Sequence, residues 1–384
     1  MSFLYLDHHA TTPVDPRVLA AMLPYFTQKP GNPASRSHSF GWEASSAVER
    51  ARAQIARLAG AEPRGIVFTS GATESNNLAL QGAAQALRAR GNHIVTQASE
   101  HKAVLDTVHH LERSGFRVTI LAPEPDGRLD LARLRAAILP ETILVSVMHA
   151  NNEIGAIQPV AEIGAICRER GVLFHCDAAQ AFGKIPVDVA ASAIDLLSVS
   201  AHKMYGPKGA GALYIRRGVS LAAQIHGGGH EGGMRSGTLN VPGIVGFGEA
   251  CALAESEMAE EAVRIRGLRN RLLQHLQSSA AGRGMRINGG MEHRLPGNLN
   301  VSFTGVDGDA LLAAIPEIAV SAGSACSSGA DSSYVLEAIA TPPEFLQCAV
   351  RFGIGRSNTE AEIDRAAARV STAVAELRAL SPVL

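Results

Sequence analysis

The chain contains the segment SVSAHKMYGPKG at residues 198–209, followed by the strand-like run GALYI at residues 211–215. Lys203 comes just after an apolar run and just before a Gly-Pro turn. This placement predicts an amine at the end of a strand that points into a cleft. A nucleophilic lysine needs burial or a cationic neighbour to lower its pKa, and His202 and Lys208 are candidate neighbours. Taken alone, a lysine before such a turn is more often an ordinary solvated loop residue.

Length and composition indicate a globular enzyme of two domains. The chain has 384 residues, of which 46% are hydrophobic and 18% are charged, and its formal net charge is -1. This length exceeds what one compact core usually organises. The balanced charge offers no electrostatic footprint for nucleic acid or an anionic membrane. We therefore expect no direct nucleic-acid partner.

The sequence shows no targeting or membrane signal. No basic region precedes the short apolar run at the N-terminus, and no later run reaches the roughly 18 to 20 apolar residues that span a bilayer. We expect a cytoplasmic protein without a membrane partner. The five cysteines are scattered and form no CxxC pair, so neither a disulfide framework nor a zinc site is expected. Four of them fall in helix or strand patterns and are expected in the core, namely Cys167, Cys176, Cys251 and Cys348.

Strand and helix patterns alternate through the first two thirds of the chain. Such alternation predicts a mostly parallel sheet with helices on both faces. Helical periodicity is also present at 18–26 and 45–59, on either side of a loop rich in turn formers. The expected strands are 93–96, 118–121, 143–147, 172–175 and 196–199, and the expected helices between them are 103–112, 131–137 and 160–170.

Polar residues of chemical interest follow four of these five predicted strands. In open α/β sheets the ligand binds at the carboxyl ends of the strands. Four such endings are hard to attribute to chance. They are Glu100-His101, residues 149–153, residues 177–180 and residues 200–203.

A short strand at 66–69 leads through Ser-Gly-Ala-Thr into a helix that begins near Thr73. Backbone N–H groups at such a turn, with the positive end of the helix dipole, can cradle a phosphate. The spacing is not that of a nucleotide P-loop, and alone it could equally be an ordinary N-cap. The same alternative holds for Asp177 taken by itself.

The pattern changes after residue 240. A long helix at 245–278 leads into a region with strands at 297–303 and 349–354 and a Ser/Gly/Cys-rich loop at 321–332. We predict a large domain at 15–264, and a small domain formed by 1–14 and 265–384 that carries this loop.

A lysine, an aspartate at a neighbouring strand end, a phosphate cradle and a histidine before a helix are what an enzyme that uses pyridoxal phosphate (PLP) requires. The whole chain resembles the cysteine desulfurases of the NifS/IscS type, in the class V aminotransferase group of fold type I PLP enzymes. The motifs that carry the resemblance are YLDHHATTP at 5–13, SGATESN at 70–76, EHK at 100–102, NNEIG at 151–155, DAAQ at 177–180, SAHK at 200–203, SACS at 324–327 and Arg351-Phe352.

The resemblance implies an α/β fold of the aspartate aminotransferase type, with a mostly parallel seven-stranded sheet in the large domain and a smaller α+β C-terminal domain. It implies that Lys203 forms the Schiff base with PLP and that Asp177 pairs with the pyridinium nitrogen. Gln180 would contact the phenolic oxygen, and His101 would stack on the ring and serve in acid/base steps.

The resemblance also implies the groups that hold the two ends of the site. Asn152 and Arg351 would bind the substrate carboxylate, for which a planar guanidinium is suited, and Asn152 is also expected beside the cofactor. The phosphate would be held by Ala72, Thr73, Ser200 and His202, with Thr238 reaching it from the partner subunit of a homodimer.

Cys326 lies among small polar residues that predict an exposed, mobile loop. By resemblance its thiolate attacks the sulfur of L-cysteine, which yields L-alanine and an enzyme-bound persulfide that the loop carries to a sulfur acceptor or iron–sulfur scaffold protein. No resident metal is expected, although Cys326 could serve as a transient iron–sulfur ligand. Without its neighbours, Cys326 could equally be a free loop thiol.

Two other functions stay open at this point. One is another class V PLP enzyme, such as a selenocysteine lyase or a small amino acid transaminase, and the other is a non-catalytic sulfur carrier or scaffold partner. The sequence reads Glu231-Gly232-Gly233 where the family commonly has Glu-Arg-Gly, so a basic residue near the expected dimer contact is missing. Sulfur donation is thus better supported than delivery to iron–sulfur clusters, thiolated tRNA or another thio-cofactor.

Overall fold

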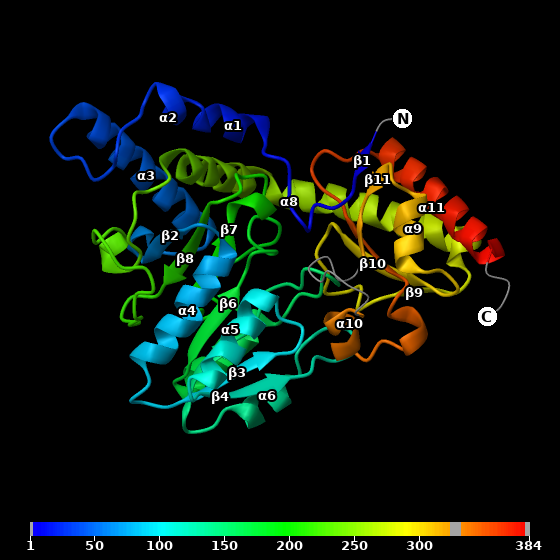
Figure 1. The fold of residues 1–384 in the computed structure, drawn as a ribbon, viewed down its shortest axis with the longest axis horizontal. Helices are drawn as coiled ribbons and strands as arrows, with labels where there is room; N and C mark the ends of the chain where they lie inside the picture. Colours follow the sequence, from blue (N-terminus) through cyan, green and yellow to red (C-terminus); the bar gives the residue numbers. More distant parts are fainter. Residues whose placement is uncertain (1–2, 323–331, 381–384) are drawn as a thin grey trace.

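The computed structural model describes residues 3–322 and 332–380. Two sheets lie side by side, and the long helix α8 (Val241–Ser278) runs from one to the other (Figure 1). Separate hydrophobic clusters fill the two parts: one centres on residues such as Phe174 and Phe247, the other on residues such as Phe303 and Phe352. The predicted domain boundaries at 14/15 and 264/265 stay a prediction.

The larger sheet confirms the predicted fold class, because it has seven strands and is mostly parallel. Its central strands are buried at nearly every residue, as expected when helices cover both faces. The one reversed strand is β8, which pairs antiparallel with both of its neighbours. In sheet order the strands are β2 (Ile66–Thr69), β8 (Gly211–Ile215), β7 (Leu196–Ser200), β6 (Leu173–Asp177), β5 (Thr142–Ser146), β3 (His93–Gln97) and β4 (Arg117–Leu121).

The helices between the strands follow the predicted ranges closely: α4 (Ala72–Ala86), α5 (Lys102–Arg113), α6 (Leu131–Ala137) and α7 (Val160–Arg170). Two expectations near the N-terminus were wrong. Pro24 divides the helix predicted at 18–26 into α1 (Pro16–Met22) and α2 (Pro24–Thr27), because a proline nitrogen cannot donate to the preceding turn. Helix α3 (Ser39–Leu58) begins six residues before the predicted start, since the ring of His38 accepts a hydrogen bond from the Gly41 N–H and caps it.

The smaller sheet has the order β12 (Ser321–Ala322), β13 (Ala349–Gly353), β10 (Asn298–Phe303) and β9 (Met285–Ile287), and every pairing in it is antiparallel. The first strand, β1 (Leu4–Tyr5), pairs with β11 (Ile318–Ala319) beside this sheet (Figure 1). The N-terminus therefore joins the C-terminal part of the chain. The accompanying helices are α9 (Gly308–Ala314), α10 (Tyr334–Ala338) and α11 (Glu360–Leu380).

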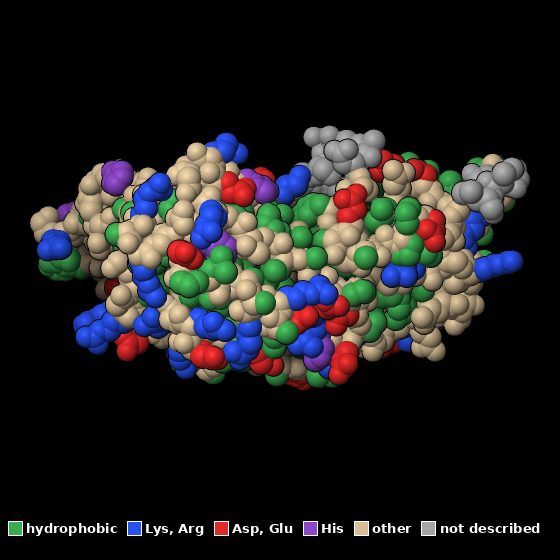
Figure 2. Space-filling view, turned by 90° about the horizontal axis from the view of Figure 1, so that it is seen from below, with side chains coloured by type: hydrophobic (Ala, Val, Ile, Leu, Met, Phe, Trp, Pro, Cys, Tyr) green, Lys and Arg blue, Asp and Glu red, His purple; other side chains and the backbone are tan. Residues whose placement is uncertain are grey.

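The surface and the core agree with the composition. Basic and acidic side chains are interspersed on the face shown in Figure 2. Among the residues that the structure describes, no helix is long and apolar enough to cross a membrane. The four cysteines expected in the core, Cys167, Cys176, Cys251 and Cys348, are buried, which confirms that prediction.

Candidate active site

A cavity of about 630 Å³ lies at the carboxyl ends of the parallel strands. The structure brings ten of the predicted site residues together around it. Thr238 is exposed before the start of α8 and lies outside this cavity, and Cys326 lies outside the described residues. The predicted residues that line the cavity are Ala72, Thr73, His101, Asn152, Asp177, Gln180, Ser200, His202, Lys203 and Arg351.

Lys203 lies in a short 3-10 turn (Ala201–Lys203) that follows directly on β7. Its Nζ donates hydrogen bonds to two backbone carbonyl oxygens of the N-terminal segment, that of His9 at 2.8 Å and that of Ala10 at 2.7 Å. The same segment holds the turn itself, because the Thr12 N–H donates to the His202 carbonyl oxygen at 2.9 Å. The predicted position of this amine, at a strand end and in a cleft, is thus observed.

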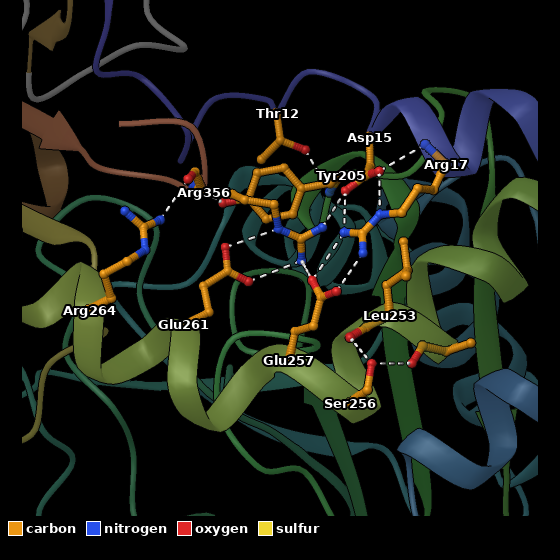
Figure 3. A network of polar contacts seen from close by, with 11 residues as sticks. Thr12, Asp15, Arg17, Tyr205, Leu253, Ser256, Glu257, Glu261, Arg264 and Arg356 are labelled. Atoms are coloured by element: carbon orange, nitrogen blue, oxygen red, sulfur yellow. Dashed lines mark hydrogen bonds and ion pairs between the residues drawn. The ribbon is translucent and has the colours of Figure 1, made fainter. Parts of the chain in front are cut away.

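The turn after Lys203 is fixed by a polar network that reaches the smaller sheet (Figure 3). Tyr205 has a φ of 66°, a conformation that is costly for a residue with a side chain. Its hydroxyl accepts a hydrogen bond from the Arg356 N–H at 2.7 Å, and the Arg356 guanidinium lies 4.3 Å from the centre of its ring. Arg356 also pairs with Asp15 at 2.6 Å and with Glu261 of α8 at 3.0 Å. Three other segments of the chain, at Asp15, Glu261 and Arg356, therefore support the backbone beside Lys203.

Asp177 is the last residue of β6, and it is buried at the cavity wall. One carboxylate oxygen accepts a hydrogen bond from the Asn76 side chain at 2.6 Å. The other accepts from the Ala179 N–H at 2.9 Å, the local contact that a capping residue makes. The capping interpretation and the cofactor interpretation of Asp177 are therefore compatible, because both contacts leave the carboxylate at the cavity.

The two predicted histidines at the cavity, His101 and His202, are neutral imidazoles. Burial lowers the pKa of His101, and its Nδ1 accepts a hydrogen bond from the Ala103 N–H at 3.0 Å at the start of α5. The ring proton of neutral His101 therefore sits on Nε2. Burial, with Lys203 and Lys208, lowers the pKa of His202 to about 4. Neither ring adds positive charge near neutral pH.

The amino end of α4 suits a phosphate group. Its N-cap residue is Gly71, which has no side chain, so among the described residues no capping side chain bonds the first N–H groups, at Ala72 and Thr73, which line the cavity. The one acid in the first turn, Glu74, pairs with Arg235 at 2.8 Å, which offsets its charge. At another wall of the cavity the buried Oδ1 of Asn152 has no partner among the described residues. These donors and acceptors fit the expected PLP.

Arg351 closes the far end of the cavity from β13. Its guanidinium donates to the Asn152 carbonyl oxygen at 2.9 Å, to the Asp7 carboxylate at 2.9 Å and to the Ser321 hydroxyl at 3.0 Å. The Nε of Arg351 is buried and has no partner among the described residues. One donor of this side chain is thus left for an anionic group.

Sequence reasoning missed two buried carboxyl groups near the cavity. Burial raises the pKa of both Glu100 and Glu153 to about 8, so both hold a proton at neutral pH. Glu153 accepts a hydrogen bond from the Ser333 hydroxyl at 2.5 Å, and the Tyr334 hydroxyl donates to the Glu100 carbonyl oxygen at 2.8 Å. Both acids belong to motifs identified in the sequence, EHK and NNEIG, but the sequence of a motif does not show whether its acid is buried.

Comparison with known proteins gives a consistent result. The family model for aminotransferase class-V matches residues 4–366. The chain is 58% identical to the cysteine desulfurase IscS of Anaeromyxobacter dehalogenans (strain 2CP-C) over 383 residues, which cover 99% of this chain and 94% of the relative. It is 54% identical to the cysteine desulfurase IscS of Escherichia coli O139:H28, again over 99% of this chain and 95% of the relative.

Solved structures agree with the sequence comparison. A NifS-like protein superimposes with a TM-score of 0.91 at 39% identity, over 97% of this chain and 100% of the other. A NifS-like protein from Rickettsia africae superimposes with a TM-score of 0.87 at 31% identity, over 97% of this chain and 99% of the other.

Proposed function

Because the chain belongs to the class V aminotransferase family, and within it to the cysteine desulfurases of the NifS/IscS type, we propose that it is a PLP-dependent cysteine desulfurase that converts L-cysteine to L-alanine and an enzyme-bound persulfide on Cys326. The observation that carries this function is the position of Lys203 and Asp177, which extend from adjacent strands into one cavity. Bound PLP supplies an electron sink for the carbon and nitrogen of an amino acid.

The chain's own residues bind and orient the cofactor. Lys203 would provide the amine that holds the cofactor, and its Nζ would move protons during the reaction. Asp177 holds the proton of the pyridine nitrogen, and its orientation is fixed by Asn76 and by the Ala179 N–H. The phosphate is held by the uncapped end of α4 at Ala72 and Thr73, together with Ser200 and His202.

Other residues act on the ring and the substrate. His101 would stack on the ring, with its Nε2–H as the proton it can donate, and Gln180 would contact the phenolic oxygen. Arg351 would bind the carboxylate of L-cysteine through its guanidinium, whose buried Nε has no partner among the described residues, and Asn152 would lie beside it. The buried surroundings exclude water from this end of the cavity and strengthen these contacts.

In the proposed sulfur transfer, Cys326 is the nucleophile that accepts the sulfur atom. Its thiolate attacks the sulfur of L-cysteine, an S–S bond forms as the C–S bond breaks, and the carbon takes up a proton to give L-alanine. The atoms balance, because L-cysteine and one thiol become L-alanine and one persulfide. The persulfide then passes its outer sulfur to an acceptor protein, in a pathway such as iron–sulfur cluster assembly.

The active protein is a homodimer. Large apolar side chains are exposed in the N-terminal part of the chain, and we infer that a second subunit covers them and supplies its Thr238 to this cavity. Glu231 in the glycine-rich loop pairs with Arg52 at 2.9 Å, so the loop is anchored although the family's basic residue is replaced by Gly232. The exposed side chains are Leu19, Leu23, Phe26, Phe40 and Trp42.

The test is Cys326→Ser with L-cysteine as the substrate. The variant should keep the absorbance change that accompanies substrate binding, and it should lose nearly all alanine formation, because a serine hydroxyl is a poor sulfur acceptor. Mass spectrometry of the digested wild type should find one added sulfur on the peptide that carries Cys326. Cys348→Ser is the matched control: its thiol donates to the Glu344 carbonyl oxygen at 3.4 Å, a contact that serine can keep, and it should retain activity.

Two results would contradict the proposal. Full alanine release by Cys326→Ser would favour a PLP-dependent lyase that cleaves the C–S bond without an enzyme thiol. A persulfide found mainly on one of the buried cysteines would remove Cys326 from the reaction.

A further inference from the structure

Lys184 lies beside Gln180, a residue that lines the cavity, and the proposed function gives Lys184 no role. It follows Gln180 by four residues, in a turn held by backbone hydrogen bonds from the Phe182 N–H to the Ala178 carbonyl oxygen at 2.8 Å and from the Lys184 N–H to the Ala181 carbonyl oxygen at 2.9 Å. Side chains at this spacing in a helical turn point the same way. The ammonium of Lys184 therefore reaches the side chain of Gln180.

The contacts of Gln180 fix the orientation of its amide. Its Oε1 lies 3.2 Å from the Lys184 Nζ and 3.0 Å from the His9 Nδ1. Lysine is a donor only, so the atom that faces it must be the carbonyl oxygen, and the His9 Nδ1 must carry the ring proton. The amide NH₂ donates to the His9 carbonyl oxygen at 2.9 Å. Gln180 can therefore offer only its NH₂ group to an oxygen in the cavity.

The side chain of Gln180 links Lys184 to the reactive amine. The Gln180 NH₂ and the Lys203 Nζ donate to the same carbonyl oxygen, that of His9, at 2.9 Å and 2.8 Å, and the Lys184 Nζ lies 3.2 Å from the Gln180 Oε1. Burial, then Lys203 and Arg351, lower the pKa of Lys184 to about 7, and Glu261 acts in the opposite direction. The Glu261 carboxylate itself pairs with Arg356 at 3.0 Å. Lys184 is thus a cation that titrates near neutral pH beside Lys203.

Besides Glu261, three titratable residues line a small cavity of about 30 Å³ with Lys184, and all three are uncharged at neutral pH. Burial lowers the pKa of His8 to about 4 and holds that of His9 well below its ordinary value, whereas burial raises the pKa of Tyr205. No second titration near pH 7 therefore arises from these three neighbours.

We propose that Lys184 is a positioning residue with two effects. It holds the Gln180 amide so that the NH₂ group points toward the cofactor's phenolic oxygen. Its positive charge also sets the pH at which the cofactor bound to Lys203 changes protonation. The inference rests on the proposed function, since it requires PLP attached to Lys203. Loss of a nearby cation favours the protonated form of a basic nitrogen. Removal of the Lys184 charge should therefore move this pH upward.

The experiment is a pH titration of the visible absorbance, at about 400 to 420 nm, of the PLP-loaded protein. In Lys184→Met the midpoint should rise by about one pH unit, the size of shift that a neighbouring charge causes. Lys184→Arg keeps a cation at every pH of the titration, so its midpoint should not rise above that of the wild type. Lys184→Gln keeps a donor for Gln180 and loses the charge, so its midpoint should shift as that of Lys184→Met does. Lys29→Met, which removes a surface cation paired with Glu43, is the matched control and should show no shift.

The outcomes separate the inference from the function. Circular dichroism identifies the folded variants, and Lys184→Gln decides if Lys184→Met does not fold. A wild-type midpoint in a folded, PLP-loaded neutral variant overturns the role of Lys184 and leaves the proposed function intact. A wild-type protein that forms no visible band with PLP would refute the proposed function itself.

Discussion

Replacement of Glu100 by glutamine should make the protein more stable at pH 8. Glu100 is fully buried between β3 and α5. One carboxyl oxygen accepts hydrogen bonds from the Met148 N–H at 2.6 Å and from the Gln97 side chain at 2.9 Å, and the other oxygen is buried without a partner among the described residues. A glutamine can keep both contacts with its oxygen and needs no charge.

The magnitude follows from the pKa. Burial, and to a lesser degree Asp177, raises the pKa of Glu100 from 4.5 to about 8. Between these two values the folded protein holds a proton that the unfolded chain has released, so the free energy of unfolding falls as the pH rises. At about 1.36 kcal/mol per pH unit, the loss from this one group is on the order of 4 kcal/mol. Glu100→Gln cannot lose a proton, and its stability should not fall in this way.

The assay is urea unfolding of the PLP-loaded wild type and Glu100→Gln at several values between pH 5 and pH 8. The two proteins should be similar near pH 5, and the variant should become progressively more stable toward pH 8. Glu376→Gln, on the exposed face of α11, is the matched control and should follow the wild type. Parallel curves for wild type and Glu100→Gln across the whole range would refute the reasoning, because they would mean that Glu100 does not hold its proton in the folded protein.

Three further variants test the site and its support. Lys203→Ala should lose the visible band and all turnover, since PLP could then bind only through contacts such as those to its phosphate; normal steady-state activity would remove Lys203 from the reaction. Asp177→Asn should remain folded by circular dichroism yet lose about 100-fold or more in kcat, a typical cost of a lost proton-holding group; unchanged activity would leave Asp177 as a cap only. Tyr205→Phe deprives the Arg356 N–H of its acceptor and should lower the free energy of unfolding by about 1 to 3 kcal/mol; an unchanged value in urea unfolding would show that water replaces the hydroxyl.

The sequence predicted those features of the fold that depend on local pattern. The strands and helices from β3 to β7 lie within one or two residues of the expected ranges, because each strand is a compact apolar run and each helix has a clear period. The polar strand endings predicted one site, and the cavity at these endings contains them. The reversed direction of β8 was not predicted, because the sequence of a five-residue strand does not indicate whether it pairs parallel or antiparallel with its neighbours.

The pKa shifts that burial causes could not be predicted from the sequence either. Glu100, Glu153 and Lys184 each stand in or beside a recognised motif, yet a motif does not say whether its acid or base is solvated. Only the packed structure shows that burial moves the pKa of all three groups toward neutrality. Chemically active ionisation near pH 7 therefore arises here from long-range packing and not from residue type alone.

The N-terminal motif YLDHHATTP illustrates why a segment can belong to a site without supplying a reactive side chain. The carbonyl oxygens of His9 and Ala10 hold the Lys203 amine, while two residues earlier Asp7 holds the guanidinium of Arg351. β1 anchors this segment beside the smaller sheet, and Lys203 follows a strand of the larger one. A single stretch of backbone therefore fixes the distance between the group expected to carry the cofactor and the group expected to bind the substrate carboxylate. A change in how the two sheets are placed would alter that distance, so the position of the N-terminal segment is itself a condition for catalysis.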